Sequence, residues 1–144
     1  MNIIYMTNPL LFGSSIGMTI FHYIGLHKYN PKNDLLIYSV LFGLTTSILN
    51  HALSHSIFKY LDRSMMIIAF FINIYFTTKI YLKKKDKYYV ENIYLLIIFA
   101  VILFFITKVI LKSGKNPTNY IPHISAHFII TIANILLFKE SNKN

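Results

Sequence analysis

Five long hydrophobic runs take up most of this chain, and short polar segments separate them. The runs cover roughly residues 9–27, 35–58, 64–82, 90–111 and 119–138. Each run is close to the ~20 apolar residues that a helix needs to cross a bilayer. Only 13% of the residues are charged, about half the share found in soluble domains. We therefore expect an all-α integral membrane protein, a bundle of about five transmembrane helices.

The polar segments predict the turns of this bundle. Residues 30–34 contain Pro and Asn, and residues 113–117 contain Gly, Asn and Pro, which are typical of turns. We expect the tight joint between the second and third runs at Lys59 to Arg63. No soluble domain fits between the runs, so residues 1–144 form a single transmembrane domain in this interpretation. The start of the chain lacks a basic region followed by a cleavage site, which favours a retained helix over residues 9–27.

Basic residues give the chain a net charge of +9, and their placement indicates a topology rather than nucleic-acid binding. They lie mainly between or at the ends of the hydrophobic runs, as the positive-inside rule describes. One side of the bundle would hold five of them and the other side nine, namely Lys28, Lys32, Lys79, Lys83, Lys84, Lys85, Lys87, Lys139 and Lys143. The richer side is predicted to be cytoplasmic. The N-terminus would then be lumenal or extracellular and the C-terminus cytoplasmic, in an endomembrane or the plasma membrane.

Five polar residues stand out inside the hydrophobic runs. Ser47 and His51 are four residues apart in the second run, and His123 and His127 have the same spacing in the fifth. Residues at this spacing lie on one face of a helix. Asp62 stands at the start of the third run. Polar and ionisable side chains within a bilayer are costly, and they usually mark a functional site.

The predicted topology brings these residues to a similar depth in one leaflet. At a rise of about 1.5 Å per residue, His51 would lie roughly 10 Å below the surface, and His123 and His127 about 6–12 Å. Three neutral imidazoles suit zinc, with a fourth position open for water. The chain has no cysteine, so thiolate ligands are excluded. The sequence therefore predicts a zinc centre on His51, His123 and His127.

The same residues resemble a known family. Ser47-Ile-Leu-Asn-His51, then Asp62 within Leu61-Asp62-Arg63-Ser64-Met65-Met66-Ile67, and finally His123-Ile-Ser-Ala-His127 are similar to the motifs of the CREST superfamily of membrane hydrolases. That superfamily includes alkaline ceramidases, adiponectin receptors and haemolysin-III-like proteins. Its members usually have seven spans, so a chain with five resembles a shortened form.

This resemblance implies zinc as the cofactor and a membrane lipid as the substrate. The implied activity is intramembrane hydrolysis of a lipid amide or ester bond, as in a ceramidase, with zinc-bound water as the nucleophile. Asp62 would transfer the proton, and Ser47 would stabilise the developing oxyanion. Five helices provide fewer side chains to enclose a lipid than seven do. A second copy of the chain, which could complete the lipid site, is therefore a candidate partner.

Each of these residues also has a purely structural interpretation. The histidines could cap helices or form hydrogen bonds across the bundle, and Asp62 could be the N-cap of the third helix. His55 lies one turn after His51 and is a candidate fourth ligand, although an interfacial position is favoured. We expect His22 and His27 to be interfacial on the opposite side. For Asn73 and Asn134, hydrogen bonding within the bundle is the favoured role.

Two other functions fit parts of the pattern. A zinc-stabilised receptor, channel or membrane-remodelling protein would keep the metal without turnover. A di-iron lipid hydroxylase or desaturase would also use histidine boxes, but it normally needs more histidines and carries them on the cytoplasmic side. The sequence leaves the lipid substrate, the organelle and the oligomeric state open.

Overall fold

The computed structural model describes residues 8–53, 55–85, 87–112 and 117–142, and it confirms the expected helical architecture. No strand occurs among these residues. The described elements are five α-helices and a short 3-10 helix, η1. Their bounds are α1 Pro9–Tyr29, α2 Asp34–Ala52, α3 Ser56–Lys83, α4 Tyr88–Ile110, η1 Pro117–Tyr120 and α5 Ile121–Ser141. All five α-helices are long and apolar enough to cross a membrane, which is consistent with a multi-pass membrane protein.

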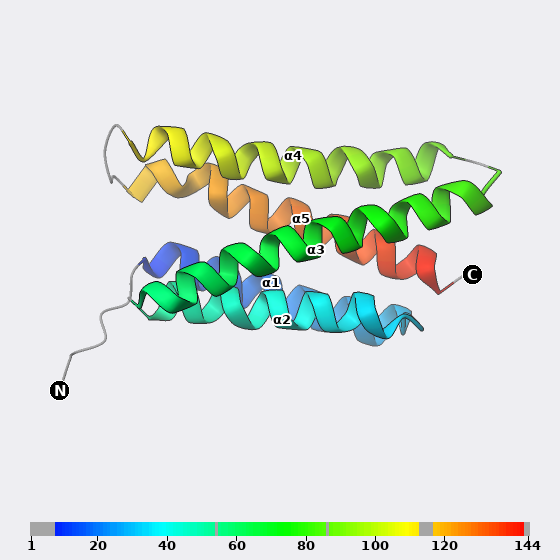
Figure 1. Ribbon diagram of the computed structural model, residues 1–144, viewed down its shortest axis with the longest axis horizontal. Helices are drawn as coiled ribbons and strands as arrows, with labels where there is room; N and C mark the ends of the chain where they lie inside the picture. Colours follow the sequence, from blue (N-terminus) through cyan, green and yellow to red (C-terminus); the bar gives the residue numbers. More distant parts are fainter. Residues whose placement is uncertain (1–7, 54, 86, 113–116, 143–144) are drawn as a thin grey trace.

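The five α-helices lie side by side along the long axis of the molecule (Figure 1). Helix α5 packs mainly against α4 and α1, and α2 packs mainly against α3 and α1. Helix α3 crosses the bundle obliquely in Figure 1 and has 28 residues. That length corresponds to about 42 Å, more than the ~30 Å of a hydrocarbon core. A helix longer than the hydrocarbon core fits by tilting or by extending beyond it, and the oblique course of α3 is such a tilt relative to its neighbours.

Polar side chains gather inside the bundle, whereas large hydrophobic side chains cover its outside. Buried polar and charged residues are about as many as buried apolar ones. Exposed Phe, Tyr, Leu and Ile side chains occur on every α-helix, for example Tyr23, Phe42, Phe71, Leu95 and Phe128. Such a surface is unfavourable in water but matches a lipid environment. The packing thus supports the inference drawn from hydropathy.

The start and end of α1 follow local rules. The side chain of Asn8 accepts hydrogen bonds from the backbone N–H groups of Leu10 at 3.0 Å and Leu11 at 3.2 Å, as an N-cap should. Pro9 occupies the first helical position, where its missing N–H costs nothing. The helix ends at Asn30, whose left-handed conformation (φ 42°, ψ 59°) closes the last turn.

The predicted joint between the second and third helices is wrong by several residues. Helix α2 ends at Ala52, and α3 begins at Ser56, so Lys59 and Arg63 lie within the first turns of α3. The imidazole of His55 caps α3 by accepting a bond from the N–H of Ile57 at 3.3 Å. Charged residues can stay helical at a membrane surface because their side chains reach water without a loop. Asp86, Lys115 and Lys143 of the predicted loops lie outside the described residues.

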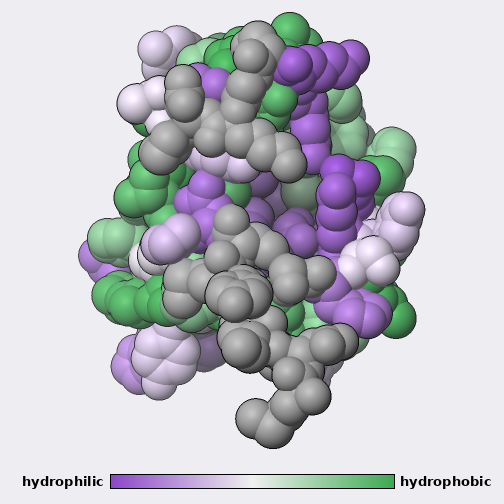
Figure 2. All heavy atoms as spheres, turned by 90° about the vertical axis from the view of Figure 1, so that its left-hand side faces the viewer, coloured by the Kyte–Doolittle hydropathy of each residue, from purple (hydrophilic) through white to green (hydrophobic). Residues whose placement is uncertain are grey.

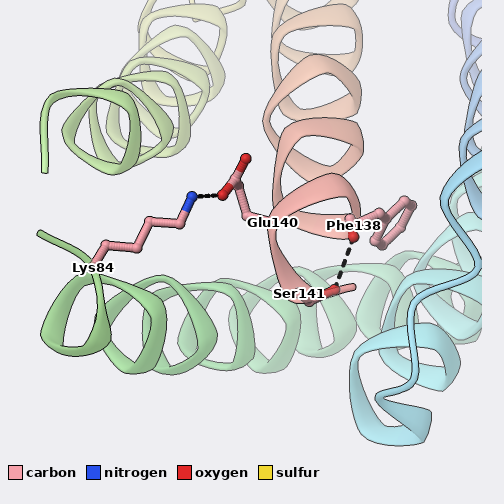
Figure 3. Close-up of polar contacts among 4 residues, drawn as sticks. All are labelled: Lys84, Phe138, Glu140 and Ser141. Atoms are coloured by element: carbon pink, nitrogen blue, oxygen red, sulfur yellow. Dashed lines mark hydrogen bonds and ion pairs between the residues drawn. The ribbon is translucent and has the colours of Figure 1, made fainter. Parts of the chain in front are cut away.

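At the other end of the bundle, an ion pair and a close helix contact fix α5. Lys84, just after α3, pairs with the buried carboxylate of Glu140 on α5, and the Ser141 hydroxyl donates to the carbonyl of Phe138 (Figure 3). Gly25 lets α1 approach α5 closely, because a Cβ there would come within 2.9 Å of Ile135 Cγ1. These contacts hold the register between α1, α3 and α5 and so position the polar residues of α5.

Candidate functional site

Three histidines predicted to bind a metal come together at one end of the bundle. His51 lies in the last turn of α2, and His123 and His127 lie in the first two turns of α5. Their ring centroids are 5.5 Å (His51–His123), 5.6 Å (His51–His127) and 4.8 Å (His123–His127) apart. All three side chains are buried. Residues distant in the sequence thus form one compact cluster, which we call the His triad.

The His triad fits a transition-metal ion by donor type and by spacing. One ring nitrogen from each histidine lies within 4.8 Å of the other two. A tetrahedral zinc ion holds nitrogens at about 2.0–2.1 Å, which places them roughly 3.3 Å apart. Small side-chain rotations would close the remaining difference. Phe104 of α4 packs edge-on against His123, with ring centroids 5.2 Å apart, and so restrains that ring.

A serine of α1 sets the orientation of His127. Ser14 Oγ donates to the backbone carbonyl of Leu11 at 2.8 Å, and it also lies 2.8 Å from His127 Nδ1. Because the serine hydrogen is used on Leu11, the imidazole must donate from Nδ1. The proton is then on Nδ1, and Nε2 keeps its lone pair for a metal. Metal-binding histidines in proteins commonly have this kind of outer hydrogen bond.

The carboxylate of Asp62 lies near the triad with a partner that sequence reasoning missed. Asp62 is buried in the second turn of α3, and its Oδ2 accepts a hydrogen bond of 2.7 Å from Asn50 Nδ2 on α2. His55 is the N-cap of α3, so the alternative that Asp62 caps this helix is wrong. Arg63 and Lys108 are close enough to interact electrostatically with the carboxylate. These contacts offset part of the cost of burying a charge.

Ser47 is buried on α2 and forms a hydrogen bond to α1. Its Oγ lies 3.1 Å from Ser15 Oγ, and Ser15 donates to the Leu11 carbonyl at 3.0 Å. Ser47 is therefore the donor in the serine pair. Its hydrogen is already used, and its oxygen remains available as an acceptor. The expected role of Ser47 as a donor to an oxyanion would require this bond to break.

One cavity of about 580 Å³ connects these groups. Ser47, Asp62, His123 and His127 line it near the triad, and His22, Asn73 and Asn134 line it farther along the bundle. Most other lining side chains are apolar, among them Phe70, Ile97 and Ile130. Figure 2, which looks onto the triad end of the bundle, shows hydrophilic residues gathered in the middle of this end and apolar residues around much of its rim. An apolar chain with a polar head would match such a cavity.

The remaining histidines and asparagines are divided between surface and interior. His55 is exposed and belongs to no metal-binding group among the described residues. His27 is exposed, as expected, but the expectation for His22 is wrong because only 1% of its surface is accessible. Its ring packs against Phe138 inside the bundle. Asn73 donates to Asn134 at 2.8 Å, which confirms the predicted hydrogen bonding between helices.

Several residues at the site gave only weak signals in the sequence. Ser14 and Ser15 are adjacent serines in an apolar run, and serine is common there as a small packing residue. Asn50 precedes His51 directly, so helical periodicity alone would turn it away from the histidine face. Its contact with Asp62 depends on how α2 packs against α3, and no local pattern specifies that.

The Asn50–Asp62 bond gives a stability prediction. Replacing Asn50 by Leu leaves the buried carboxylate without its 2.7 Å donor, so we expect the free energy of unfolding to fall by about 1–3 kcal/mol. The measurement is a denaturant titration in detergent micelles. Thr45→Val on the exposed side of α2 is the matched control, and it should change stability little. The double variant Asn50→Leu/Asp62→Leu removes both polar partners and should recover most of the loss. A double variant as unstable as Asn50→Leu would contradict this account.

Comparisons with protein-family models, with curated proteins and with solved structures found no match to this chain. The chemistry of the site therefore follows from its own residues. Three buried imidazoles whose ring nitrogens lie within 4.8 Å of one another and a buried carboxylate belong to the same end of the bundle. His123, His127 and Asp62 line one apolar cavity.

Proposed function

We propose that this chain is a zinc-dependent intramembrane hydrolase that cleaves a lipid amide or ester bond, as its resemblance to the CREST superfamily implies. The observation that carries the proposal is the His triad itself. Its three imidazoles come from two helices, with α3 and α4 between them in the sequence, yet their nitrogens lie within 4.8 Å of one another. Bundle packing alone does not require three imidazoles at one point.

The surroundings of the triad support hydrolysis rather than a purely structural metal. Three protein ligands leave one coordination position open, as in catalytic zinc sites, whereas structural sites use four. Zinc bound there would activate a water molecule for attack on a carbonyl carbon. The cavity beside the triad is apolar enough for a lipid chain.

The residues around the triad would then handle the proton and orient the reactants. Asp62 would take a proton from the attacking water and deliver it to the leaving nitrogen or oxygen as the single bond between that atom and the carbonyl carbon breaks. Asn50 holds the carboxylate in place through its 2.7 Å bond. Ser47 contributes its oxygen as an acceptor for the water, because its hydrogen is donated to Ser15. The products are a fatty acid and an amine or alcohol.

We also propose that the triad end of the bundle faces the lumen or the cell exterior, with the C-terminal end of α5 in the cytoplasm. The excess of lysine at the opposite end supports this orientation. Because the chain has no cysteine, single substitutions provide unique labels. We expect a membrane-impermeant maleimide to label Lys112→Cys only from the lumenal or extracellular side of the membrane and Lys32→Cys only from the cytoplasmic side. The reverse pattern would invert the topology.

Metal content and turnover test the proposed function directly. The purified protein should contain about one zinc per chain, measured by mass spectrometry, and it should hydrolyse at least one member of a ceramide and lysolipid panel. His123→Ala should lose zinc and hydrolysis together, because one of three ligands is gone. His55→Ala is the matched control, since His55 is exposed and outside the triad, and it should keep both.

The other outcomes separate the rival functions. Well-folded protein without metal would overturn the proposal and leave the triad as a packing feature. Zinc without hydrolysis across the panel would favour a zinc-stabilised receptor, channel or remodelling protein. Iron together with oxygen-dependent lipid oxidation would favour a hydroxylase or desaturase.

Ser14 gives a finer test of the metal site. Ser14→Ala removes the 2.8 Å bond that orients His127, so we expect zinc affinity to fall about 10- to 100-fold. A competition titration with a chelator measures this change. Ser39→Ala serves as control, because this buried serine of α2 donates to the carbonyl of Leu36 in its own helix and not to a histidine. Equal affinities in both variants would show that Ser14 does not orient a ligand.

A further inference from the structure

A second polar cluster lies in the same cavity, farther along the bundle than the His triad. Asn73 Nδ2 donates to Asn134 Oδ1 at 2.8 Å, Asn134 Nδ2 lies 2.9 Å from His22 Nε2, and His22 Nδ1 lies 2.8 Å from the carbonyl of Met18. The three side chains come from α3, α5 and α1 and are buried. We call these three residues the Asn–Asn–His chain.

The carbonyl of Met18 fixes the direction of every hydrogen bond in this chain. A carbonyl only accepts, so His22 must donate from Nδ1, and its neutral ring then accepts at Nε2. Asn134 must present its NH2 group to Nε2 and its oxygen to Asn73. Asn73 in turn must present its NH2 group to Asn134. The oxygen of Asn73 is therefore the free end of the Asn–Asn–His chain.

This oxygen, Asn73 Oδ1, is buried and has no hydrogen-bond partner among the described residues. Asn73 is 1% exposed and lines the cavity. Leaving a buried acceptor unpaired costs free energy, and native proteins keep few such groups. An acceptor retained beside a cavity points to a donor that arrives with a ligand.

A ligand with an apolar body explains this acceptor better than a buried water. A buried water usually makes two to four hydrogen bonds, and apart from the second N–H of each asparagine the described side chains nearby have their donors in use. His22 uses its donor on Met18, and Ser39, which also lines the cavity, donates to Leu36 at 2.9 Å. The other side chains in this part of the cavity are apolar. One acceptor in apolar surroundings suits a hydrocarbon chain that carries one donor.

We propose that the cavity binds a lipid chain bearing a hydroxyl or amide N–H group within its length, and that this group donates to Asn73 Oδ1. The inference rests on the proposed function for the direction of the chain, with its carbonyl end at the His triad. Asn134 lies seven residues beyond His127, and Asn73 lies eleven beyond Asp62, so the acceptor is about 10–16 Å from the triad along the bundle. An extended chain covers that distance in roughly eight to fourteen bonds. The substrate class is therefore a lipid hydroxylated or amidated near the middle of its chain.

Binding of four fatty acids of equal length tests the proposal. They are octadecanoic acid, the same acid with a mid-chain hydroxyl, the acid with that hydroxyl methylated, and the acid with a hydroxyl beside the carboxylate. Displacement of a fluorescent fatty acid from the purified full chain gives each affinity. We expect the mid-chain hydroxy acid to bind about five- to tenfold more tightly than the other three. Equal affinities for all four acids in the wild-type protein would overturn the proposal.

Variants assign the preference to Asn73. Asn73→Leu should abolish the preference, so that the mid-chain hydroxy acid and the other three acids bind with similar affinities. Ser39→Ala, a matched change in the wall of the same cavity, should keep the preference. A preference that survives in Asn73→Leu would overturn the assignment. If Asn73→Leu does not fold, the comparison of methylated and free hydroxyl in the wild-type protein still decides the outcome.

The result is separable from the test of the proposed function. The affinities do not depend on turnover, so a mid-chain preference in a protein without zinc or hydrolysis would remove the enzyme assignment and keep the binding site. Hydrolysis that needs zinc, together with equal affinities for the four acids, would keep the enzyme and remove this inference.

Discussion

Polar groups inside an apolar bundle must find partners among themselves, and this requirement organises the whole structure. Hydrophobic side chains cover the outside of the bundle. Neither water nor lipid tails can therefore supply hydrogen bonds to the polar groups. Helix α1 meets the requirement at two places through its own backbone. The carbonyl of Leu11 accepts from Ser14 and Ser15, and the carbonyl of Met18 accepts from His22. These contacts then extend to α2 and α5.

The two backbone carbonyls also set the protonation of two imidazoles. The Leu11 carbonyl accepts from Ser14, whose oxygen then accepts from His127 Nδ1. The Met18 carbonyl accepts directly from His22 Nδ1. Both rings therefore carry their proton on Nδ1 and keep a lone pair on Nε2. The Nε2 lone pair of His22 accepts a hydrogen bond from Asn134, whereas Nε2 of His127 would bind the metal in the proposed function. The same local rule thus gives one histidine a structural role and makes the other suitable as a ligand.

The sequence predicted the fold class and the grouping of the triad, because both depend on strong and simple signals. Hydropathy determines the number of helices, and spacing at i, i+4 brings His123 and His127 to one face. Two spans, α3 and α4, lie between the helix of His51 and the helix of His123 and His127. Because this number is even, the chain returns to the end of the bundle where His51 lies, so counting spans was enough to place the histidine pair beside His51. The joint at Lys59 to Arg63 was predicted wrongly because a charged helical turn and a charged loop look alike in sequence.

Other details could not be predicted because they depend on packing between helices. Nothing near His22 marks it as buried, and its position follows from the close approach of α1 and α5 at Gly25. The partners Asn50 and Ser14 likewise depend on the rotation of each helix about its axis. Ser47 was predicted to stabilise an oxyanion, and it lines the cavity, but the direction of its hydrogen bond follows from the contact between Ser15 and Leu11.

The arrangement of the triad has a consequence for the order of assembly. His51 is made early, whereas both other imidazoles belong to α5, the most C-terminal of the described helices. During synthesis the first four helices can enter the membrane with only one of the three histidines of the His triad. The triad forms only when α5 inserts and reaches α1 and α2, so metal capture would report that the bundle is complete.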